Sequence, residues 1–412
     1  MTARRALVLT GSLGMGHHVV TEVVAGSLAR MDVQVEVLDC MSLLGRAGAR
    51  AGDWVFRRLM DVPTLYDGLH FAHLRPGSAL AGAMDRAATG RLVPALRRHL
   101  QAEPAELVVA AFATGASAIA KLGPPGTRPT TVALCTDVTP HRLWVQPGVD
   151  LFLVTSSAAA AAVRRYHPTA RVAVVPPPLR PAFHRPPSRA EARAELGIAP
   201  DARCALLMGG GWGLGPLAAG ARALAAAGVD VLAVAGSNRS ALRALAVAAR
   251  AEPRIHPLGF TDRVAALMAA ADVVVTTPGA TTCSEARAVG RPMVLLDVVP
   301  GHGRDNVQHE LSLGGADVSD PEPERLAASV LAALERAGAG TSRSAGTRPG
   351  AGTRPGAGTG PGPATGETFE AAFAAALAAA GAPVAHGSGC LPSMAGEHSG
   401  TPPVGAAAKE AD

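Results

Sequence analysis

Short apolar runs alternate with longer stretches of helical character along most of the chain, and this alternation restricts the fold more than any other feature. In the first half, the apolar runs lie at residues 4–11, 34–40, 106–112, 131–137 and 150–156. They are nearly continuous in Val, Leu and Ala, which is typical of strands covered on both faces of a parallel sheet. The sequence therefore predicts an α/β fold built on a doubly wound parallel sheet.

A second series of the same kind follows, with apolar runs at 204–210, 229–236, 255–260, 272–279 and 292–298. Between the two series lies the proline-rich segment 174–187, VVPPPLRPAFHRPP, which we expect to break all regular structure and to act as a linker. A chain of 412 residues is long enough to form two cores. Two such units would enclose a cleft between the carboxyl ends of their strands, where open α/β sheets bind ligands.

The sequence after residue 337 differs in character from these two series. Residues 338–366 repeat AGTRPG-like units, whose Gly, Pro and Thr content cannot bury apolar surface, and we expect them to be disordered. Residues 367–381 predict a helix, and residues 382–412 a disordered tail. The domains are accordingly expected at 1–180 and 181–337.

Composition excludes several classes of function. Lys121 and Lys409 are the only lysines, the arginines are dispersed, and aromatic residues make up 3%, so the sequence predicts no nucleic-acid binding. Five cysteines without a CxxC pair, and the lack of DxD or HExxH, argue against a metal site. No apolar run reaches the roughly 18 residues of a spanning helix. We expect a cytoplasmic protein whose membrane contact, if any, is peripheral on the inner face of the cell membrane.

Two glycine-rich loops each follow a predicted strand and open a helix. The loop GSLGMGHH, residues 11–18, departs from the GxGxxG pattern because histidines replace its third glycine. His17 or His18 would face the cleft, where a helix N-terminus favours a neutral ring able to accept a proton. A capping or merely exposed histidine is equally consistent with these residues. The second loop, MGGGWGLGPL at 208–217, would place backbone amides on the same cleft.

The segment TTPGATTCSEARAVGRP, residues 276–292, is the clearest candidate for an anion site. Pro278 and Gly279 turn the chain after a strand, Thr281 and Thr282 supply hydroxyls at a helix start, and Glu285 follows one turn later. Such an arrangement could hold a diphosphate on free amides and hydroxyls, with a carboxylate near ribose hydroxyls. The alternative is an ordinary helix start at which Glu285 complements the helix dipole.

Two further loops carry polar side chains after a strand. PGHGRDN, residues 300–306, offers His302, Asp305 and Asn306 for bonds to sugar hydroxyls, or a capped turn. CTDVTPHRLW, residues 135–144, offers Asp137 and His141, which could flank an acceptor or form a surface turn.

In their order and spacing, these motifs resemble the monogalactosyldiacylglycerol synthases and processive diacylglycerol glucosyltransferases, and more distantly the N-acetylglucosaminyltransferase that forms lipid II. The resemblance covers about residues 5–337 and rests on SLGMGHH, TDVTPHRLWVQPGVDLFLVTS, PLRPAF, MGGGWGLGPL, AGSN, and the long segment from LGFTDRV to PGHGRDN. It implies a GT-B fold with an N-terminal acceptor domain and a C-terminal nucleotide-sugar domain. It also implies inverting transfer of a hexosyl group from a UDP-sugar, with no metal and no cofactor.

The resemblance assigns roles residue by residue. His17 matches the catalytic base. Gly16, grouped with the donor-binding positions, matches the residue that lets the acceptor come close. Asp137 and His141 lie on the acceptor side. The donor positions are implied to contact the diphosphate, ribose, uracil or sugar, and they are Gly211, Asn238, Phe260, Gly279, Thr281, Thr282, Glu285, His302 and Asn306.

The chain also departs from these families. His302 and Gly303 stand where the lipid galactosyltransferases carry Gln and Glu, so the identity of the sugar is left open. A lipid-like acceptor such as diacylglycerol is favoured by aromatic and arginine residues within 54–76, which suit a lipid interface or an ordinary amphipathic helix pair. The alternatives are a soluble acceptor, a UDP-sugar epimerase and a binding protein without activity. Nothing in the sequence predicts an oligomeric state.

Overall fold

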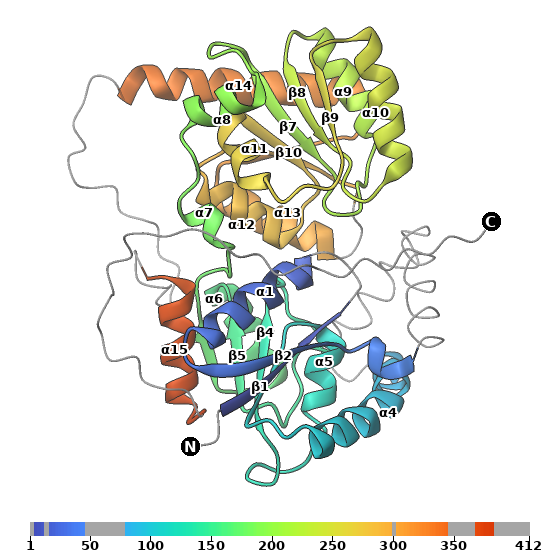
Figure 1. Ribbon diagram of the computed structural model, residues 1–412, viewed down its shortest axis with the longest axis vertical. Coiled ribbons are helices and arrows are strands. Elements are labelled where there is room, and N and C mark those ends of the chain that lie inside the picture. Colours follow the sequence, from blue (N-terminus) through green and yellow to red (C-terminus); the bar gives the residue numbers. More distant parts are fainter. Residues whose placement is uncertain (1–3, 12–15, 46–78, 299–301, 345–366, 383–412) are drawn as a thin grey trace, which may run out of the picture.

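The computed structural model describes residues 4–11, 16–45, 79–298, 302–344 and 367–382. Within these ranges the strands form two six-stranded sheets, one from each half of the chain, and every pairing is parallel. Figure 1 shows one sheet and its helices in the lower half of the molecule and the other in the upper half. The predicted fold class, α/β with two doubly wound parallel sheets, is confirmed.

The N-terminal sheet has the strand order β2-β1-β3-β4-β5-β6. Its inner strands β3 and β5 are buried throughout, and β1 and β4 are buried except at their first residues, which explains their apolar sequence. The edge strand β2 reads VQVEVLD and is largely half-exposed. Val8 of β1 lies between Val37 of β2 and Val109 of β3. The strands are β1 (Arg4–Thr10), β2 (Val33–Asp39), β3 (Leu107–Ala110), β4 (Thr130–Cys135), β5 (Leu151–Val154) and β6 (Val172–Val174).

Helices cover both faces of this sheet (Figure 1). On one face, α1 (Gly16–Ala29) contributes Val24 and Leu28 to a core that also contains Phe373 of α15 (Phe369–Ala379). The opposite face is covered by α4 (Ala79–Ala102), α5 (Ala113–Ile119) and α6 (Ser157–Tyr166), beside the short helix η1 (Ser42–Leu44).

The C-terminal sheet has the order β12-β11-β10-β7-β8-β9. Its strands are β7 (Cys204–Met208), β8 (Asp230–Val234), β9 (Ile255–Leu258), β10 (Val273–Thr276), β11 (Met293–Leu296) and β12 (Ala316–Ser319). One face is covered by α8 (Arg189–Leu196), α11 (Val264–Ala270), α12 (Ala280–Ala288) and α13 (His302–Leu313). The other is covered by α9 (Leu217–Ala226), α10 (Arg239–Ala251) and α14 (Pro323–Ser344).

The strand orders fix where a ligand can bind. In each sheet, the first strands in the chain are added on one side of β1 or β7. The later strands are added on the opposite side of that first strand. The reversal falls between β1 and β3 in one sheet and between β7 and β10 in the other. Crevices form at the carboxyl ends of strands at such reversal points. The loops after β1, β3, β7 and β10 are therefore where the fold places a binding site.

The expectation that residues 174–187 lack all regular structure is wrong. Val174 ends β6, and α7 (Pro181–His184) forms a single helical turn within the segment. Pro181 stands at the first helical position, where its fixed φ suits a helix and its missing N–H removes no bond. Phe183 is buried in the C-terminal core, which anchors this turn to the second domain.

Three elements were not predicted from the sequence as the structure shows them. β6 has only three residues, and β12 reads ADVS and is mostly not buried, so it forms no continuous apolar run. α14 continues to Ser344, past residue 338, where we expected the repeat to begin. Residues 338–344 contain no proline, and extending an existing helix requires no new nucleation.

Candidate active site

The N-termini of two helices from different domains face each other. α1 begins at Gly16, directly after β1, and α12 begins at Ala280, directly after β10. A Cβ atom placed on Gly16 would lie 3.1 Å from the hydroxyl oxygen of Thr281 in the other domain. Helix N-termini present unpaired amide groups and a partial positive charge, so a pair of them favours an anion between the domains.

His17 stands in the first turn of α1, and its ring is held by the loop after β3. Its Nδ1 atom lies 2.9 Å from the backbone oxygen of Ala111. A carbonyl oxygen can only accept, so Nδ1 carries the hydrogen, and Nε2 is the nitrogen through which a neutral ring accepts a proton. The edge of Phe112 packs on the ring at 5.0 Å between centroids. This geometry suits a general base.

Asp137 is linked to His17 through a tryptophan that sequence reasoning did not single out. The indole N–H of Trp144 donates to Oδ2 of Asp137 over 2.6 Å, and the Trp144 ring lies 6.5 Å from that of His17. Trp144 is buried, so it fixes the Asp137 carboxylate in the loop after β4. His141 accepts from the backbone N–H of Leu143 over 3.3 Å, which closes a turn in the same loop.

The helix start at Gly279 has no side-chain cap. Gly279 is the N-cap residue of α12 in an extended conformation, and it has no side chain to accept from the amides of the first turn. Thr281 and Thr282 occupy that turn, with Thr281 directed toward α1 as described above. The predicted diphosphate segment therefore forms the expected strand, turn and helix, and an external acceptor could serve its first amides.

Glu285 does not complement the start of α12 but pairs with the interdomain linker. Its side chain is buried, and Nη2 of Arg180 donates to its Oε1 over 3.0 Å. Burial raises the pKa of Glu285, and the positive charge and hydrogen bond of Arg180 offset part of that rise. One carboxylate oxygen of the predicted ribose contact is thus occupied by Arg180.

Arg180 is a site residue that sequence reasoning missed, although it lies within the quoted motif PLRPAF. Its guanidinium lies 5.1 Å from the centre of the Phe183 ring, a cation–π contact that orients it along the linker. Its Nε atom is buried and has no hydrogen-bond partner among the described residues. Arg180 thus connects the linker to the helix that would bind the donor.

Asn306 positions the donor loop from α13. Its side-chain amide is buried and donates to the backbone oxygen of Pro278 over 2.8 Å. Arg287 of α12 and Glu310 of α13 form an ion pair between the same two helices. Asn306 is therefore a support for the turn at 278–279 in this structure, and its predicted contact with the sugar stays a prediction. His302 begins α13, and its side chain lies outside the described part of the chain.

Gly211 and Asn238 join the loops after β7 and β8. The Gly211 oxygen accepts from both the backbone N–H and the hydroxyl of Ser237, each over 2.9 Å. Asn238 caps α10 by accepting from Ala241, and its amide donates to the Gly213 oxygen over 3.3 Å. These bonds hold the donor-domain loops in shape.

Phe260 differs from the other donor positions because its side chain meets solvent. It follows β9 and is 65% exposed, more than any other large hydrophobic side chain of the described residues. An exposed aromatic ring beside this edge of the sheet is available to stack on a planar base.

The structure brings Gly16, His17 and Thr281 together between the domains, and Thr281 also lines a small interdomain cavity of about 20 Å³ with Val20 and Pro177.

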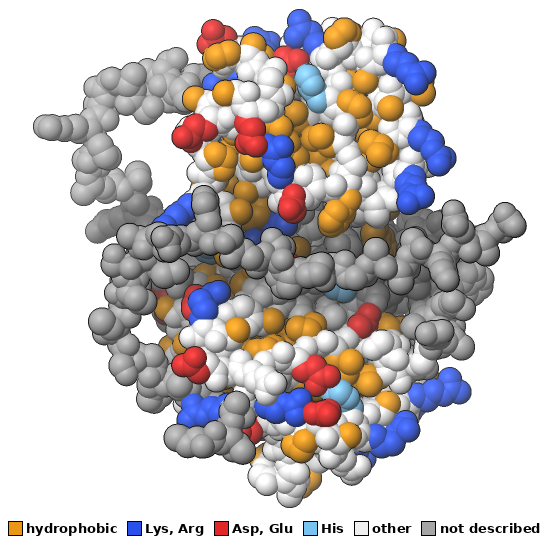
Figure 2. All heavy atoms as spheres, viewed as in Figure 1, with side chains coloured by type: hydrophobic (Ala, Val, Ile, Leu, Met, Phe, Trp, Pro, Cys, Tyr) orange, Lys and Arg blue, Asp and Glu red, His pale blue; other side chains and the backbone are white. Residues whose placement is uncertain are grey.

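No group of three or more His, Cys, Asp or Glu side chains is placed to hold a metal ion within the described ranges. In the same ranges, no helix is both long and apolar enough to cross a bilayer. On the face shown in Figure 2, Lys and Arg side chains are spread over both domains.

Comparison with known proteins adds a family to this geometry. Residues 218–341 match the glycosyltransferase family 28 C-terminal domain. Probable monogalactosyldiacylglycerol synthase 2 of Oryza sativa subsp. japonica is 31% identical over 211 residues, which are 48% of this chain and 45% of that protein. The UDP-N-acetylglucosamine–N-acetylmuramyl-(pentapeptide) pyrophosphoryl-undecaprenol N-acetylglucosamine transferase of Mycobacterium sp. (strain KMS) is 35% identical over 180 residues, 41% and 48% of the two chains.

The chain thus matches less than half of the length of either relative. Among solved structures, that of Arabidopsis thaliana UGT89C1 complexed with UDP is similar in fold, with a TM-score of 0.54 and 14% identity over 80% of this chain and 90% of that one. The predicted resemblance and the GT-B arrangement of two facing domains are both confirmed.

Proposed function

We propose that this chain, whose residues 218–341 match the glycosyltransferase family 28 C-terminal domain, moves a hexosyl group from a UDP-sugar to an acceptor hydroxyl. The observation that carries the proposal is the opposition of α1 and α12 across the domain boundary. A diphosphate bound at the start of α12 would lie beside His17, because Gly16 approaches Thr281 so closely. Donor and base would thus meet at one point.

His17 acts as the general base in this proposal. The neutral ring, with its hydrogen on Nδ1, takes the acceptor hydroxyl's proton on Nε2 as the oxygen attacks the anomeric carbon. The bond from that carbon to the diphosphate breaks, and UDP leaves with both electrons. Attack from the face opposite the leaving group inverts the anomeric centre. A positioned base of this kind contributes about 10²- to 10⁴-fold to a rate.

The C-terminal domain holds the donor. Amides and hydroxyls at Gly279, Thr281 and Thr282 would bind the diphosphate, and the positive end of α12 would stabilise the charge that develops on departing UDP. Glu285 would accept from ribose hydroxyls through the oxygen not held by Arg180, and Phe260 would stack on the uracil. Gly211, Asn238 and Asn306 keep these loops in register through the bonds described above.

A lipid-like acceptor such as diacylglycerol is the finer part of the proposal. The name of one relative contains the galactolipid monogalactosyldiacylglycerol, and the name of the other contains a pyrophosphoryl-undecaprenol acceptor, so both names refer to lipids. Residues 54–76, on which the sequence-based argument for a lipid interface rests, lie outside the described residues. A soluble acceptor is the alternative.

The test is a screen of UDP-sugars against total membrane lipid extract and a panel of soluble acceptors, followed by mass spectrometry. A hexose-sized mass increase on a lipid, with release of UDP, supports the proposal. If only soluble acceptors are glycosylated and the protein does not float with anionic vesicles, the acceptor is a soluble compound and not a lipid. Conversion of UDP-N-acetylglucosamine to its epimer without an acceptor would indicate an epimerase instead.

A further inference from the structure

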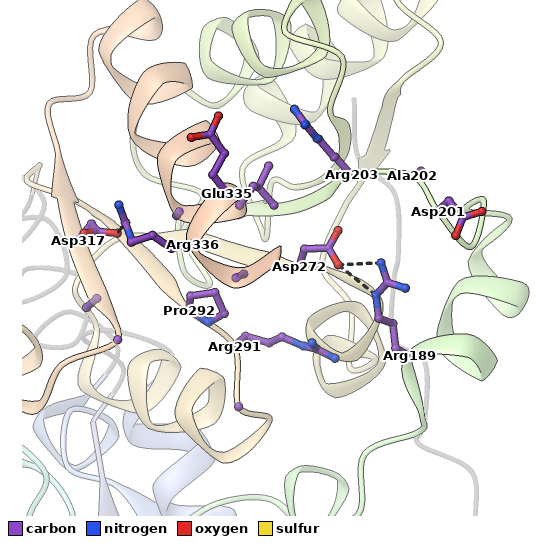
Figure 3. Close-up of a pocket in the computed structure, with 16 residues that line it drawn as sticks. Arg189, Asp201, Ala202, Arg203, Asp272, Arg291, Pro292, Asp317, Glu335 and Arg336 are labelled. Carbon is purple, nitrogen blue, oxygen red and sulfur yellow. Dashed lines mark hydrogen bonds and ion pairs between the residues drawn. The ribbon is translucent and has the colours of Figure 1, made fainter. Parts of the chain in front are cut away.

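A cavity of about 980 Å³ opens on the C-terminal domain at the amino ends of its strands (Figure 3). Its lining includes Arg203, Asp272 and Arg291, which immediately precede or adjoin the starts of β7, β10 and β11. The candidate active site lies at the carboxyl ends of the same strands. The cavity is therefore on the opposite edge of the sheet and is separate from that site.

One carboxylate at this cavity holds two guanidinium groups. Nη2 of Arg189 donates to Oδ1 of Asp272 over 2.9 Å, and Nη2 of Arg193 donates to Oδ2 over 2.8 Å. Arg193 is fully buried and its remaining donors bond to backbone oxygens. The charge of Asp272 can neutralise only one of these two cations, so one positive charge remains.

Arg291 adds a second uncompensated cation. Its Nε and Nη2 donate to the backbone oxygens of Met268 and Ala269 over 3.1 and 2.8 Å, and these partners are neutral. Burial lowers the pKa of Arg291, and the neighbouring charge of Asp272 opposes this fall while Arg189 and Arg193 add to it. Figure 3 shows the Arg291 side chain extending toward Arg189. Three guanidinium groups therefore lie around one carboxylate, and only Arg189 and Arg193 bond to it.

The other charged groups of the lining do not neutralise the excess positive charge of Arg189, Arg193 and Arg291. Arg336 is paired with Asp317. Asp201 and Glu335 are exposed, so water solvates them, and Figure 3 places both away from Arg291. Arg203 has no ion pair within the part of the chain that the structure describes. Arg291 is partly buried and has no ion pair among the described residues, and Arg189, whose side chain is exposed, shares Asp272 with the buried Arg193, so the arrangement favours an anion at the Arg189–Arg291 side.

We propose that this cavity binds a small organic phosphate, with its phosphate group bridging Arg291 and Arg189. A phosphomonoester carries about −1.5 to −2 charges at pH 7, which matches the excess of two cations. Guanidinium groups bind phosphate oxygens in a two-pronged fashion. The volume lies at the upper end of the roughly 300–1,000 Å³ of small-molecule sites, and Leu334 and Pro292 offer apolar surface to the organic part. The inference does not depend on the proposed transfer activity.

The test is calorimetric titration of the full chain with glycerol 3-phosphate in the presence of saturating UDP, which occupies any phosphate site in the interdomain cleft. We expect binding to the wild-type protein and a loss of about tenfold or more in Arg291→Gln, the effect of removing one charge-assisted contact. Arg189→Gln, which removes the other bridging guanidinium, should also weaken binding without disturbing Met268 and Ala269. The matched control is Arg250→Gln, an exposed arginine of α10 outside the lining, which should bind normally.

A second arm identifies the source of the phosphate. In this arm, the wild type and Arg291→Gln are floated on phosphatidylcholine vesicles that contain phosphatidic acid. If less of the variant than of the wild type floats, the phosphate belongs to a lipid headgroup. Normal flotation together with weakened glycerol 3-phosphate binding would assign a soluble phosphate. Equal affinity of wild type, Arg189→Gln and Arg291→Gln for glycerol 3-phosphate, or no binding to folded wild-type protein, would overturn the proposal.

Discussion

The Nδ1 atom of His17 and the backbone oxygen of Ala111 lie 2.9 Å apart, which joins the start of α1 to the loop after β3. Because this bond fixes the ring hydrogen on Nδ1, the chemistry of His17 should reside in Nε2. We expect His17→Ala to lower the turnover number by about 10²- to 10⁴-fold with little change in UDP affinity. His18→Ala, a change at the next residue of the same helix, is the control. Full transfer activity in His17→Ala would disprove the assignment.

The Arg180–Glu285 pair predicts a pH effect on donor binding. Burial raises the pKa of Glu285 and Arg180 opposes that rise, so Arg180→Gln should raise the pKa further. As the solution is acidified, Glu285 should therefore become protonated at a higher pH in Arg180→Gln than in the wild type. The affinity of the variant for UDP should begin to fall at that higher pH. Calorimetric titrations across pH 5 to about 8 measure this. Glu285→Gln should bind UDP more weakly with a flatter profile, and coincident profiles of wild type and Arg180→Gln would contradict the idea.

Phe260 should matter for binding and not for folding. At 65% exposure its truncation removes little buried surface, so Phe260→Ala should change the free energy of unfolding by less than about 0.5 kcal/mol. If the ring stacks on uracil, UDP affinity should fall by roughly 1 to 3 kcal/mol. Val247→Ala, at another exposed apolar position of the same domain, should alter neither quantity. Unchanged UDP affinity in Phe260→Ala would remove this residue from the site.

The Arg128–Asp150 pair predicts how the N-terminal domain responds to acid. Arg128 is buried and donates to both oxygens of Asp150, over 2.6 and 3.0 Å. Burial alone would raise the pKa of Asp150, but the hydrogen bonds from Arg128 and Thr131 outweigh it and lower the pKa. The pair thus stabilises the fold above the usual aspartate pKa, and this contribution disappears as pH falls through the lowered value.

Asp150→Ala should destabilise the protein by about 3 kcal/mol at neutral pH, because it leaves a buried guanidinium without its partner. Urea unfolding at several pH values measures the change. Glu106→Gln, at an exposed acidic residue of the same domain, should shift the midpoint very little. An Asp150→Ala variant as stable as the wild type at pH 7 would show that the pair is energetically neutral.

Helix α15 should be essential to the stability of the N-terminal domain. Phe373 and Leu377 are fully buried in the core beneath α1, so Phe373→Ala should cost about 3 to 5 kcal/mol. On the exposed side of the same helix, Glu370 pairs with Arg30 over 2.8 Å, and Glu370→Gln should cost at most about 1 kcal/mol. Similar unfolding midpoints for the two variants would mean that α15 does not belong to this core.

The two sheets could be predicted because their buried strands appear in the sequence as continuous apolar runs. Runs such as LVVA at β3 and MVLL at β11 are apolar on both faces, and helical stretches separate them. Contacts between segments that are distant in the sequence produce no such pattern. Neither the Arg180–Glu285 pair nor the bond between Nδ1 of His17 and the Ala111 oxygen follows from local sequence.

Candidate site residues could be located by strand position, but their partners could not be anticipated. Gly16 and Thr281 follow β1 and β10, as the motifs indicate, and the fold places them near one another. The amides of Asn238 and Asn306 and one oxygen of Glu285 are occupied within the protein, which depends on how α10, α13 and the linker pack. A side chain suited to a ligand is equally suited to a neighbouring backbone oxygen.

The return of α15 to the N-terminal domain has a mechanical consequence. The chain leaves the first domain after β6 and re-enters it at Phe369, so the second domain is an insertion attached at two points. The two domains therefore cannot be separated by cutting the chain at one position. Cleavage in the linker after β6 would leave the second domain joined to the first through α15, whose Phe373 is buried in the N-terminal core.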